Sequence, residues 1–348
     1  MRIDAYAILG DSIVGLERCT APTEHRMTSQ AIQRPNLYRR MLSLGALATL
    51  GLHEMGLAET ARQKPTIALI TKSLNKQFGR TMLDGAIDYQ KHNANDFNLV
   101  TDGIPDDSDA TAQISIVRAM IELKVNAIVL APVDSKVLIP VVAAAIGSAI
   151  IVITIDNELD DDALRSLNLN VPFVGPNDRK GAKLVGDYVA SKLTRDDEVG
   201  IITGPVGDVN SQRRTAGLSD AVQAHGLRII AVGSGKWETA SAAAVAAGML
   251  HHYPGIKALL CSNDPMAIGA VSALQAAQIT RKVYVSGYDN TDVVRRMLKD
   301  GSVLATADHF PAKQGIFGVD IALKAVVERR KQADLTRFFE TPVQLVGK

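Results

Sequence analysis

Polar side chains that could bind a ligand recur where short apolar segments of the sequence end. They include carboxylates, amides, a lysine and the single tryptophan of the chain. Carboxylates and amides form hydrogen bonds with hydroxyls, and flat aromatic rings cover apolar ring faces, so this set suits a ligand with many hydroxyls. The residues are Lys72, Asp102, Asp156, Asn157, Pro176, Asn177, Trp237, Asn263, Asp264, Asp289, Asn290, Asp308 and His309.

Some of these residues are also candidates for helix starts. Asp, Asn, Ser and Thr side chains bond the free N–H groups of a first helical turn. Asp264 precedes Pro265, and proline is preset for the first helical position. We therefore predict that Asp264 caps a helix while Asn263, one residue earlier, faces the ligand. Further candidates for capping are Asp178, Asp208 and Thr291.

Signatures of catalysis and of cofactor or metal binding are missing from the sequence. It has no G-x-G-x-x-G after a strand segment, no Walker loop, no H-E-x-x-H and no G-x-S-x-G. Cys261 lies in an apolar segment, which favours a place in the core over a nucleophile. His251 and His252 end a helical pattern and fit a solvated turn better than a metal pair. We expect no enzyme, no cofactor and no metal.

Composition and charge are those of a soluble globular protein. The 348 residues are 47% apolar and 22% charged, which suits two domains of ordinary size. The formal net charge is +1, and no run of lysine and arginine appears. A nucleic-acid partner is therefore not expected.

Apolar, strand-like segments alternate with helical patterns from residue 65 onward. The strand segments are almost wholly apolar, as expected for parallel strands that are buried on both faces. Ten strands are at the upper limit of what is usual for one open sheet, so we predict two sheets of about five strands. In such sheets, ligands bind beyond the carboxyl ends of the strands. The segments are 65–71, 97–103, 126–132, 149–156, 171–178, 198–204, 228–234, 258–264, 283–290 and 303–310.

The first 64 residues differ from the rest and are predicted to form an export signal or a poorly structured extension. Arg39 and Arg40 precede an apolar stretch of about a dozen residues, too short for the roughly 20 that a membrane-spanning helix needs. This layout is typical of a secretory signal, here near residues 27–58, and a short buried helix is the alternative. The mature chain is expected to begin near Glu59 and to be periplasmic.

Six motifs in order give the chain from Lys64 to Lys348 a family resemblance. They are "IALITKSLNKQF", "ITIDN", "NSQRRTAGL", "CSNDPMAIGAVSAL", "VSGYDNT" and "LATADHFPAKQG". With these motifs the chain resembles the periplasmic sugar-binding proteins of ABC importers, of the ribose-binding type. The resemblance implies the type I periplasmic binding protein fold, an α/β fold in which two doubly wound parallel-sheet lobes are joined by a three-segment hinge. It also implies that hinge closure grips the ligand.

The resemblance implies a lobe division and a set of ligand contacts. The N-terminal lobe would comprise 65–176 with 310–341, and the C-terminal lobe 177–309 with 342–348. Phe78 and Trp237 would be stacking platforms, and Asp156, Asn263 and Asp289 would bond hydroxyls. For Lys72 the alternative is an ion pair with Asp156 alone, and for Arg214 a structural role. The implied set is Lys72, Lys76, Phe78, Asp156, Asn157, Gln212, Arg213, Arg214, Trp237, Asn263, Asp289 and His309.

The chain departs from ribose binders at four of these places. Gly79 follows Phe78 where a second aromatic is usual, and Asn157 replaces an arginine. His309 stands where the hinge usually has glutamine, and Lys72 replaces a small polar residue. This makes the chain similar to a "Lys-Ser-Leu" subset thought to take other sugars, polyols or related polyhydroxy ligands.

A monomeric carrier that delivers a small sugar or polyol to an inner-membrane ABC permease is the main hypothesis. One alternative is a receptor for a furanone-type signal molecule, for which Lys72 and Asp156 would suit the ligand. Another is the core of a LacI-like regulator, although residues 1–64 show no pair of amphipathic helices of the kind that binds DNA.

Overall fold

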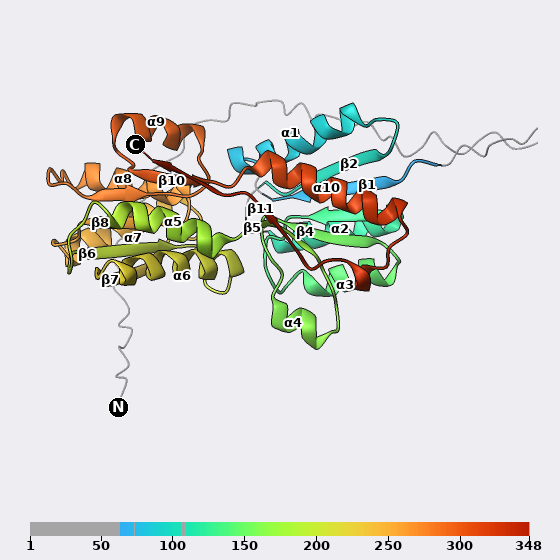
Figure 1. Cartoon of the computed structure of the whole chain (residues 1–348), viewed down its shortest axis with the longest axis horizontal. Helices are drawn as coiled ribbons and strands as arrows, with labels where there is room; N and C mark the ends of the chain where they lie inside the picture. The colour runs from blue at the N-terminus through green and yellow to red at the C-terminus, as the bar shows by residue number, and fades with distance from the viewer. Residues whose placement is uncertain (1–62, 73, 106, 108, 348) are drawn as a thin grey trace, which may run out of the picture. The chain divides into compact units, whose positions relative to one another are not determined.

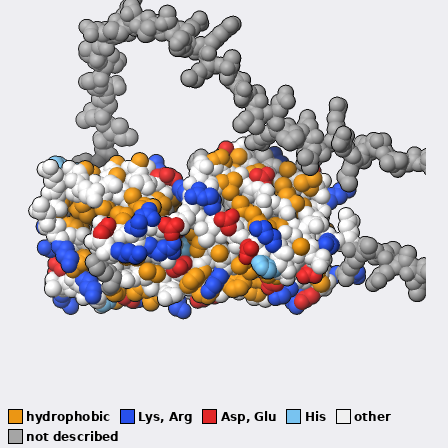
Figure 2. Space-filling model, turned by 90° about the horizontal axis from the view of Figure 1, so that it is seen from above, with side chains coloured by type: hydrophobic (Ala, Val, Ile, Leu, Met, Phe, Trp, Pro, Cys, Tyr) orange, Lys and Arg blue, Asp and Glu red, His pale blue; other side chains and the backbone are white. Residues whose placement is uncertain are grey.

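Two α/β lobes, each built on a six-stranded sheet, make up the described chain (Figure 1). The structure is a computed structural model that describes residues 63–347 apart from 73, 106 and 108. The export signal predicted near residues 27–58 lies outside the described residues. Within the described ranges, no helix combines the length and the apolar character needed to cross a membrane. Basic and acidic side chains lie side by side on both lobes in the view of Figure 2.

The sheet of the N-terminal lobe joins strands from both ends of the described chain. Its order is β11-β5-β4-β3-β1-β2, and every neighbouring pair is parallel. Because the strands are parallel, their carboxyl ends share one edge of the sheet. The strands are β1 (Thr66–Thr71), β2 (Asn98–Gly103), β3 (Ala127–Leu130), β4 (Ile151–Ile155), β5 (Phe173–Pro176) and β11 (Phe338–Thr341).

Helices cover both faces of this sheet, so its apolar strands are buried on both sides. Ile67 and Leu69 of β1 pack with residues of α1 and α10, whereas Ala68 and Ile70 pack with α2 and α3. This alternation follows from the two-residue period of a strand. The helices are α1 (Gln77–His92), α2 (Ala110–Glu122), α3 (Ile139–Gly147), α4 (Asp161–Ser166) and α10 (Pro311–Val327), and a 3₁₀ turn, η2, spans Gln332–Asp334.

The C-terminal lobe repeats this design in the order β12-β10-β9-β8-β6-β7. Helices α7, α8 and α9 pack on one face, and α5 and α6 on the other. Its strands are β6 (Glu198–Thr203), β7 (Arg228–Ser234), β8 (Ala258–Cys261), β9 (Tyr284–Ser286), β10 (Ala305–Asp308) and β12 (Gln344–Gly347). Its helices are α5 (Asp178–Ala190), α6 (Val209–Ala224), α7 (Thr239–His252), α8 (Asp264–Ala276) and α9 (Asp292–Asp300).

The chain passes between the lobes three times, as the resemblance implied. The crossings lie between β5 and α5, between β10 and α10, and between β11 and β12. Helix α10, late in the sequence, consequently packs against α1 near the start of the described chain (Figure 1). The three crossings bring segments from both lobes together at the hinge.

The prediction of about five strands per sheet was wrong by one strand in each lobe. The two missed strands, β11 and β12, lie at sheet edges, and β12 runs antiparallel to β10. Both are short and half-exposed, and Phe338 at the start of β11 is 40% exposed. Strands β11 and β12 therefore lack the continuous apolar run by which the other ten strands were identified.

Glycine permits a close approach between α7 and α8. A Cβ atom added at Gly269 of α8 would lie 2.3 Å from the carbonyl oxygen of Thr239 and 2.9 Å from the amide nitrogen of Ala243 in α7. Both atoms belong to the backbone, so neither can move aside cheaply. By contrast, a Cβ atom added at Gly248 of α7 would have nothing within 4 Å.

Two glycine-to-alanine substitutions in this helix pair should therefore have opposite effects on stability. Gly248→Ala should raise the free energy of unfolding by about 0.5–1 kcal/mol, because alanine favours a helix interior. Gly269→Ala should lower it by about 1–3 kcal/mol, because the added methyl overpacks the interface. Urea denaturation would measure both. Equal effects of the two changes would contradict the proposed close packing.

Candidate functional site

A cavity of about 200 Å³ lies between the lobes, at the carboxyl ends of both sheets. This volume is below the roughly 300–1,000 Å³ of sites for drug-sized ligands, so the cavity suits a smaller molecule. Both lobes contribute to its wall. The lining residues are Lys72, Lys76, Gln77, Phe78, Asp107, Asp156, Asn210, Arg214, Trp237, Asn263, Pro265, Ile268, Asp289, Thr291 and Val293.

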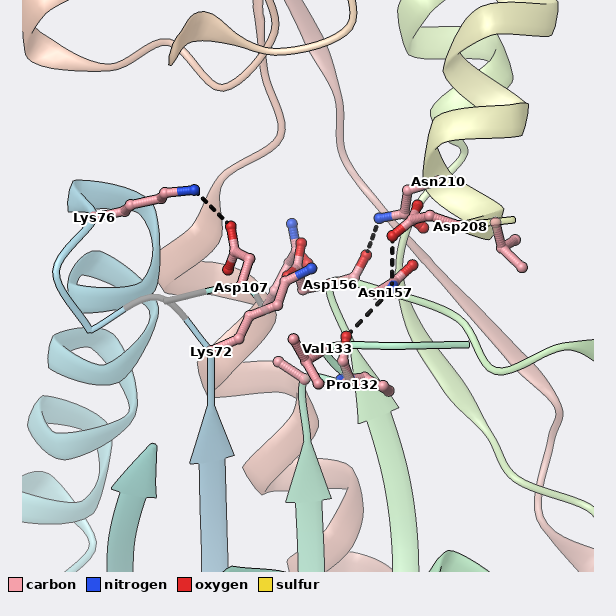
Figure 3. Close-up of polar contacts among 12 residues, drawn as sticks. Lys72, Lys76, Asp107, Pro132, Val133, Asp156, Asn157, Asp208 and Asn210 are labelled. Carbon is pink, nitrogen blue, oxygen red and sulfur yellow. Dashed lines mark hydrogen bonds and ion pairs between the residues drawn. The ribbon is translucent and has the colours of Figure 1, made fainter. Parts of the chain in front are cut away.

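An ion pair between Lys72 and Asp156 forms the floor of the cavity in the N-terminal lobe. Lys72 follows β1 and Asp156 follows β4, and their Nζ and Oδ2 atoms are 3.2 Å apart (Figure 3). Burial alone would lower the pKa of Lys72, but the carboxylates of Asp156, Asp107 and Asp208 outweigh it and raise the pKa. Lys72 is thus a permanently charged hydrogen-bond donor facing the cavity.

Arg214 forms the corresponding buried charge in the C-terminal lobe. Its Nε lies 2.7 Å from Asp178 Oδ1, and its Nη1 lies 3.5 Å from Asp289 Oδ1. The guanidinium carbon lies 3.9 Å from the centroid of the Tyr288 ring and 5.6 Å from that of Trp237. Burial opposes the charge, but Asp178, Tyr288 and Asp289 together outweigh it and raise the pKa of Arg214. Arg214 therefore both lines the cavity and holds the acids beside it.

Two aromatic side chains face the cavity from opposite lobes. Trp237, in the loop after β7, is 8% exposed. Phe78 is the second residue of α1, and one face of its ring stacks on His309, with centroids 4.7 Å apart and planes inclined by 11°. Both were predicted as platforms from the sequence, and the structure places both in the lining.

Left-handed backbone conformations direct three of the lining side chains. Asp156 and Trp237 have φ of 64°, and Asp289 has φ of 127°. Such conformations cost a non-glycine residue about 1–3 kcal/mol and persist only where the surroundings impose them. At Asp156 the carbonyl accepts a 2.6 Å bond from Asn210 Nδ2, and at Asp289 the amide donates a 2.8 Å bond to Ala307. Strain at the strand ends is thus offset by bonds around the cavity.

The predicted cap at Asp264 was wrong, because Asn263 caps α8. Asn263 is the N-cap of α8, and its Oδ1 accepts the Met266 amide at 2.9 Å, although the residue also lines the cavity. Asp264 is buried and instead accepts bonds from Thr291 and Thr306. The predicted cap at Asp178 was also wrong, because Asn177 caps α5, whereas the caps predicted at Asp208 and Thr291 are confirmed.

Four of the predicted contact residues lie outside the cavity lining. Asn157 is buried, and its Nδ2 donates to Pro132 O and Asp208 Oδ2, each at 3.2 Å (Figure 3). Gln212 is exposed, because it lies on the outer side of α6. Arg213, on the same helix, forms an ion pair with Glu158 across the lobes. His309 is buried behind Asp289, whose Oδ1 lies 3.1 Å from His309 Nε2.

The sequence interpretation missed Asn210, Asp107 and Gln77 among the polar residues of the lining, and it named Thr291 only as a helix cap. Asn210 is the second residue of α6, and its position in "NSQRRTAGL" was the available signal. Asp107 belongs to the acidic loop after β2, whereas the sequence interpretation identified Asp102, which lies within β2. Asp102 is exposed and accepts the amide of its neighbour Gly103. Loop geometry, which spacing does not determine, brings Asp107 to the cavity.

Comparison with known proteins identifies relatives over most of the chain. Residues 67–330 match the family described as "Periplasmic binding protein domain". The chain is 50% identical to the D-ribose/D-allose-binding protein of Pseudomonas aeruginosa over 289 residues, which cover 83% of this chain and 90% of that protein.

Solved structures with the same fold include two that hold a ligand. A solute-binding protein of an ABC transporter from Burkholderia multivorans is 57% identical, with a TM-score of 0.79 over 81% of this chain and 99% of that one. Its unknown ligand was built as alpha-D-erythrofuranose. A second, from Actinobacillus succinogenes with bound D-allose, is 30% identical, with a TM-score of 0.76 over 82% and 98% of the two chains.

Removing the Arg214 charge should destabilise the protein strongly. Arg214→Leu leaves Asp178 buried without its partner, which should cost about 3–5 kcal/mol of unfolding free energy. Arg179→Leu is the matched control, since Arg179 pairs with Asp220 on the surface of the same lobe, with its side chain 60% exposed. That change should cost far less, because water screens an exposed ion pair. Chemical denaturation of both variants would test the difference, and similar losses would contradict it.

Proposed function

Because the chain belongs to the periplasmic binding protein domain family, we propose that it captures one small, uncharged sugar or polyol in the cavity between its lobes. The lining residues named above, apart from Lys76, would be its contacts. The names of the relatives support sugar capture over the furanone receptor and the LacI-like regulator.

The balance of charge in the cavity wall supports an uncharged ligand. Three cations line it, and each lies beside an acid that also lines it. The distances are 3.2 Å for Lys72 and Asp156, 2.8 Å for Lys76 and Asp107, and 3.5 Å for Arg214 and Asp289. A carboxylate or phosphate ligand would meet an acid next to every cation. A neutral hydroxyl, by contrast, donates to the acid and accepts from the cation.

The observation that carries the proposal is a pair of buried acceptor oxygens that have no hydrogen-bond donor within the described chain. Asp107 Oδ1 and Asn210 Oδ1 are buried, line the cavity and accept no hydrogen bond within the described chain. An unsatisfied buried group costs about 1–3 kcal/mol. They come from opposite lobes, so hydroxyls of a single ligand would satisfy both only when the lobes are closed. Such a ligand favours the closed state because these contacts exist only there.

We extend the proposal to the carrier role. The protein would be exported to the periplasm, act as a monomer, catalyse no reaction and deliver its ligand to an ABC permease in the inner membrane. The ABC-transporter relative supports this role.

The lobe boundaries are proposed as 65–176 with 310–341 and 177–309 with 342–348. They agree with the strand order of the two sheets.

A thermal-shift screen tests the ligand class. Pentoses, hexoses and polyols, including D-ribose and D-allose, would be compared with the corresponding aldonic acids. At a concentration 100 times its Kd, a ligand adds about 2.7 kcal/mol of stability, so at least one neutral compound should raise the Tm clearly. Its aldonic acid should not, and the sugar should be recovered unchanged. No shift with any neutral compound would refute the proposal.

A conservative substitution at Asp156 tests the site. Asp156→Asn keeps the shape but removes a charged acceptor, so it should weaken binding by about 1.5–3 kcal/mol, or roughly 10–150-fold in Kd. The control is Asp102→Asn, at an exposed position of β2 in the same sheet. This variant should bind the ligand as the wild type does. Titration calorimetry would measure both. An unchanged Kd for Asp156→Asn would remove Asp156 from the site.

A further inference from the structure

Lys76 uses its ammonium group to bridge the two lobes at the edge of the cavity. Its Nζ lies 2.8 Å from Asp107 Oδ2 in the N-terminal lobe. In the C-terminal lobe it lies 2.6 Å from Glu238 Oε1 and 3.4 Å from Trp237 O. An ammonium has three N–H donors, and each of the three has an acceptor here. Lys76 therefore has no donor left for a ligand, in contrast to the direct contact predicted from the sequence.

Asp107 connects this bridge to the interior of the cavity. One of its oxygens, Oδ2, accepts from Lys76, and Figure 3 shows the carboxylate between the Lys76 and Lys72 side chains. The other oxygen, Oδ1, is buried and accepts no hydrogen bond within the described chain. A ligand hydroxyl that donates to Oδ1 would fix the orientation of the whole carboxylate, and with it the position of Lys76.

Glu238 has no competing structural task among the described residues. It is the N-cap residue of α7, but its side chain makes no capping hydrogen bond. The side chain is 51% exposed, whereas that of Lys76 is 25% exposed. The Lys76–Glu238 ion pair therefore lies on the solvent side of the cavity. Burial would lower the pKa of Lys76, but Asp107 and Glu238 together raise it, so the bridge is an ion pair.

We infer that Asp107, Lys76 and Glu238 form a clasp that senses the ligand and limits its escape. The inference rests on the proposed function, because the ligand supplies the hydroxyl that Asp107 accepts. Asp107 and Lys76 are positioning residues on the N-terminal lobe. Glu238, on the C-terminal lobe, is the ion-pair partner of Lys76. With the ligand bound, the carboxylate of Asp107 is held and presents Lys76 to Glu238. Once the ligand leaves, that restraint is lost.

A second bridge, deeper in the cleft, differs from the clasp in its exposure. Asn210 is 3% exposed, and its Nδ2 donates to the carbonyl of Asp156 across the lobes (Figure 3). Asn210 therefore supports closure from within, whereas Lys76 and Glu238 lie nearer to solvent. The clasp should consequently affect the rate of ligand release more than the encounter of ligand and protein.

Stopped-flow fluorescence tests the clasp with D-ribose and D-allose as probes. Trp237, the single tryptophan, lines the cavity and reports occupancy. Glu238→Gln should speed release roughly two- to fivefold, as expected for a half-exposed ion pair, and leave the association rate unchanged. Asp107→Asn should speed release by at least about tenfold, because a charge-assisted ligand bond is lost as well.

Two controls separate the clasp from general effects of charge. Glu122→Gln makes the same change at an exposed position at the end of α2 and should release the sugar as the wild type does. Raising the ionic strength from about 0.01 to 1 M shortens the screening length from about 30 to 3 Å. It should speed release from the wild type but not from Glu238→Gln.

The outcomes distinguish the clasp from the function on which it rests. If the wild type binds a probe and Glu238→Gln releases it at the wild-type rate, the clasp is refuted while sugar capture stands. If the wild type binds neither D-ribose nor D-allose, the clasp as described here fails together with capture of these two sugars. Faster release from Glu238→Gln than from Glu122→Gln supports the clasp.

Discussion

The pairing of buried charges is the constraint on which the cleft depends. A charge taken out of water is tolerated only beside an opposite charge with good hydrogen bonds, and removing one partner leaves the other at high cost. Lys72 with Asp156, and Arg214 with Asp178 and Asp289, meet this condition at the ends of the two sheets. The cavity is therefore rich in donors and acceptors but close to neutral, which is the chemistry of a polyhydroxylated ligand.

The same charges link the cavity to the hinge. Asp289 lies between Arg214 and His309, and His309 in turn contacts Gln314 at the start of α10. Burial, aided by the charge of Arg214, lowers the pKa of His309 to about 4, so its imidazole is neutral at physiological pH. Its stacking on Phe78 joins this network to the other lobe. A change at Asp289 thus reaches the crossing between β10 and α10 through direct contacts.

Several polar contacts of different kinds connect the two lobes, rather than one apolar interface. Asn210 and Asp156 meet deep in the cleft, whereas Lys76 and Glu238 meet nearer to solvent. The buried polar contacts select one geometry, because a misplaced partner leaves a group unsatisfied. The more exposed ion pair adds little free energy, so it is suited to adjusting a rate. This division is consistent with a carrier that must hold its ligand and also release it.

The sequence by itself determined ten of the twelve described strands, the alternation with helices and the six ordered motifs. Most of these strands are buried on both sheet faces, which demands continuous apolar runs. It also placed Lys72, Asp156, Trp237 and Asp289 at strand ends, since parallel strands share an edge. Only the tertiary structure decided which neighbour of each pair faces the ligand. It made Asn263 the cap, turned Gln212 outward and brought Asp107 inward. Those choices depend on helix phase and on contacts between residues of the two lobes that are far apart in the sequence. Local residue patterns contain no information about either.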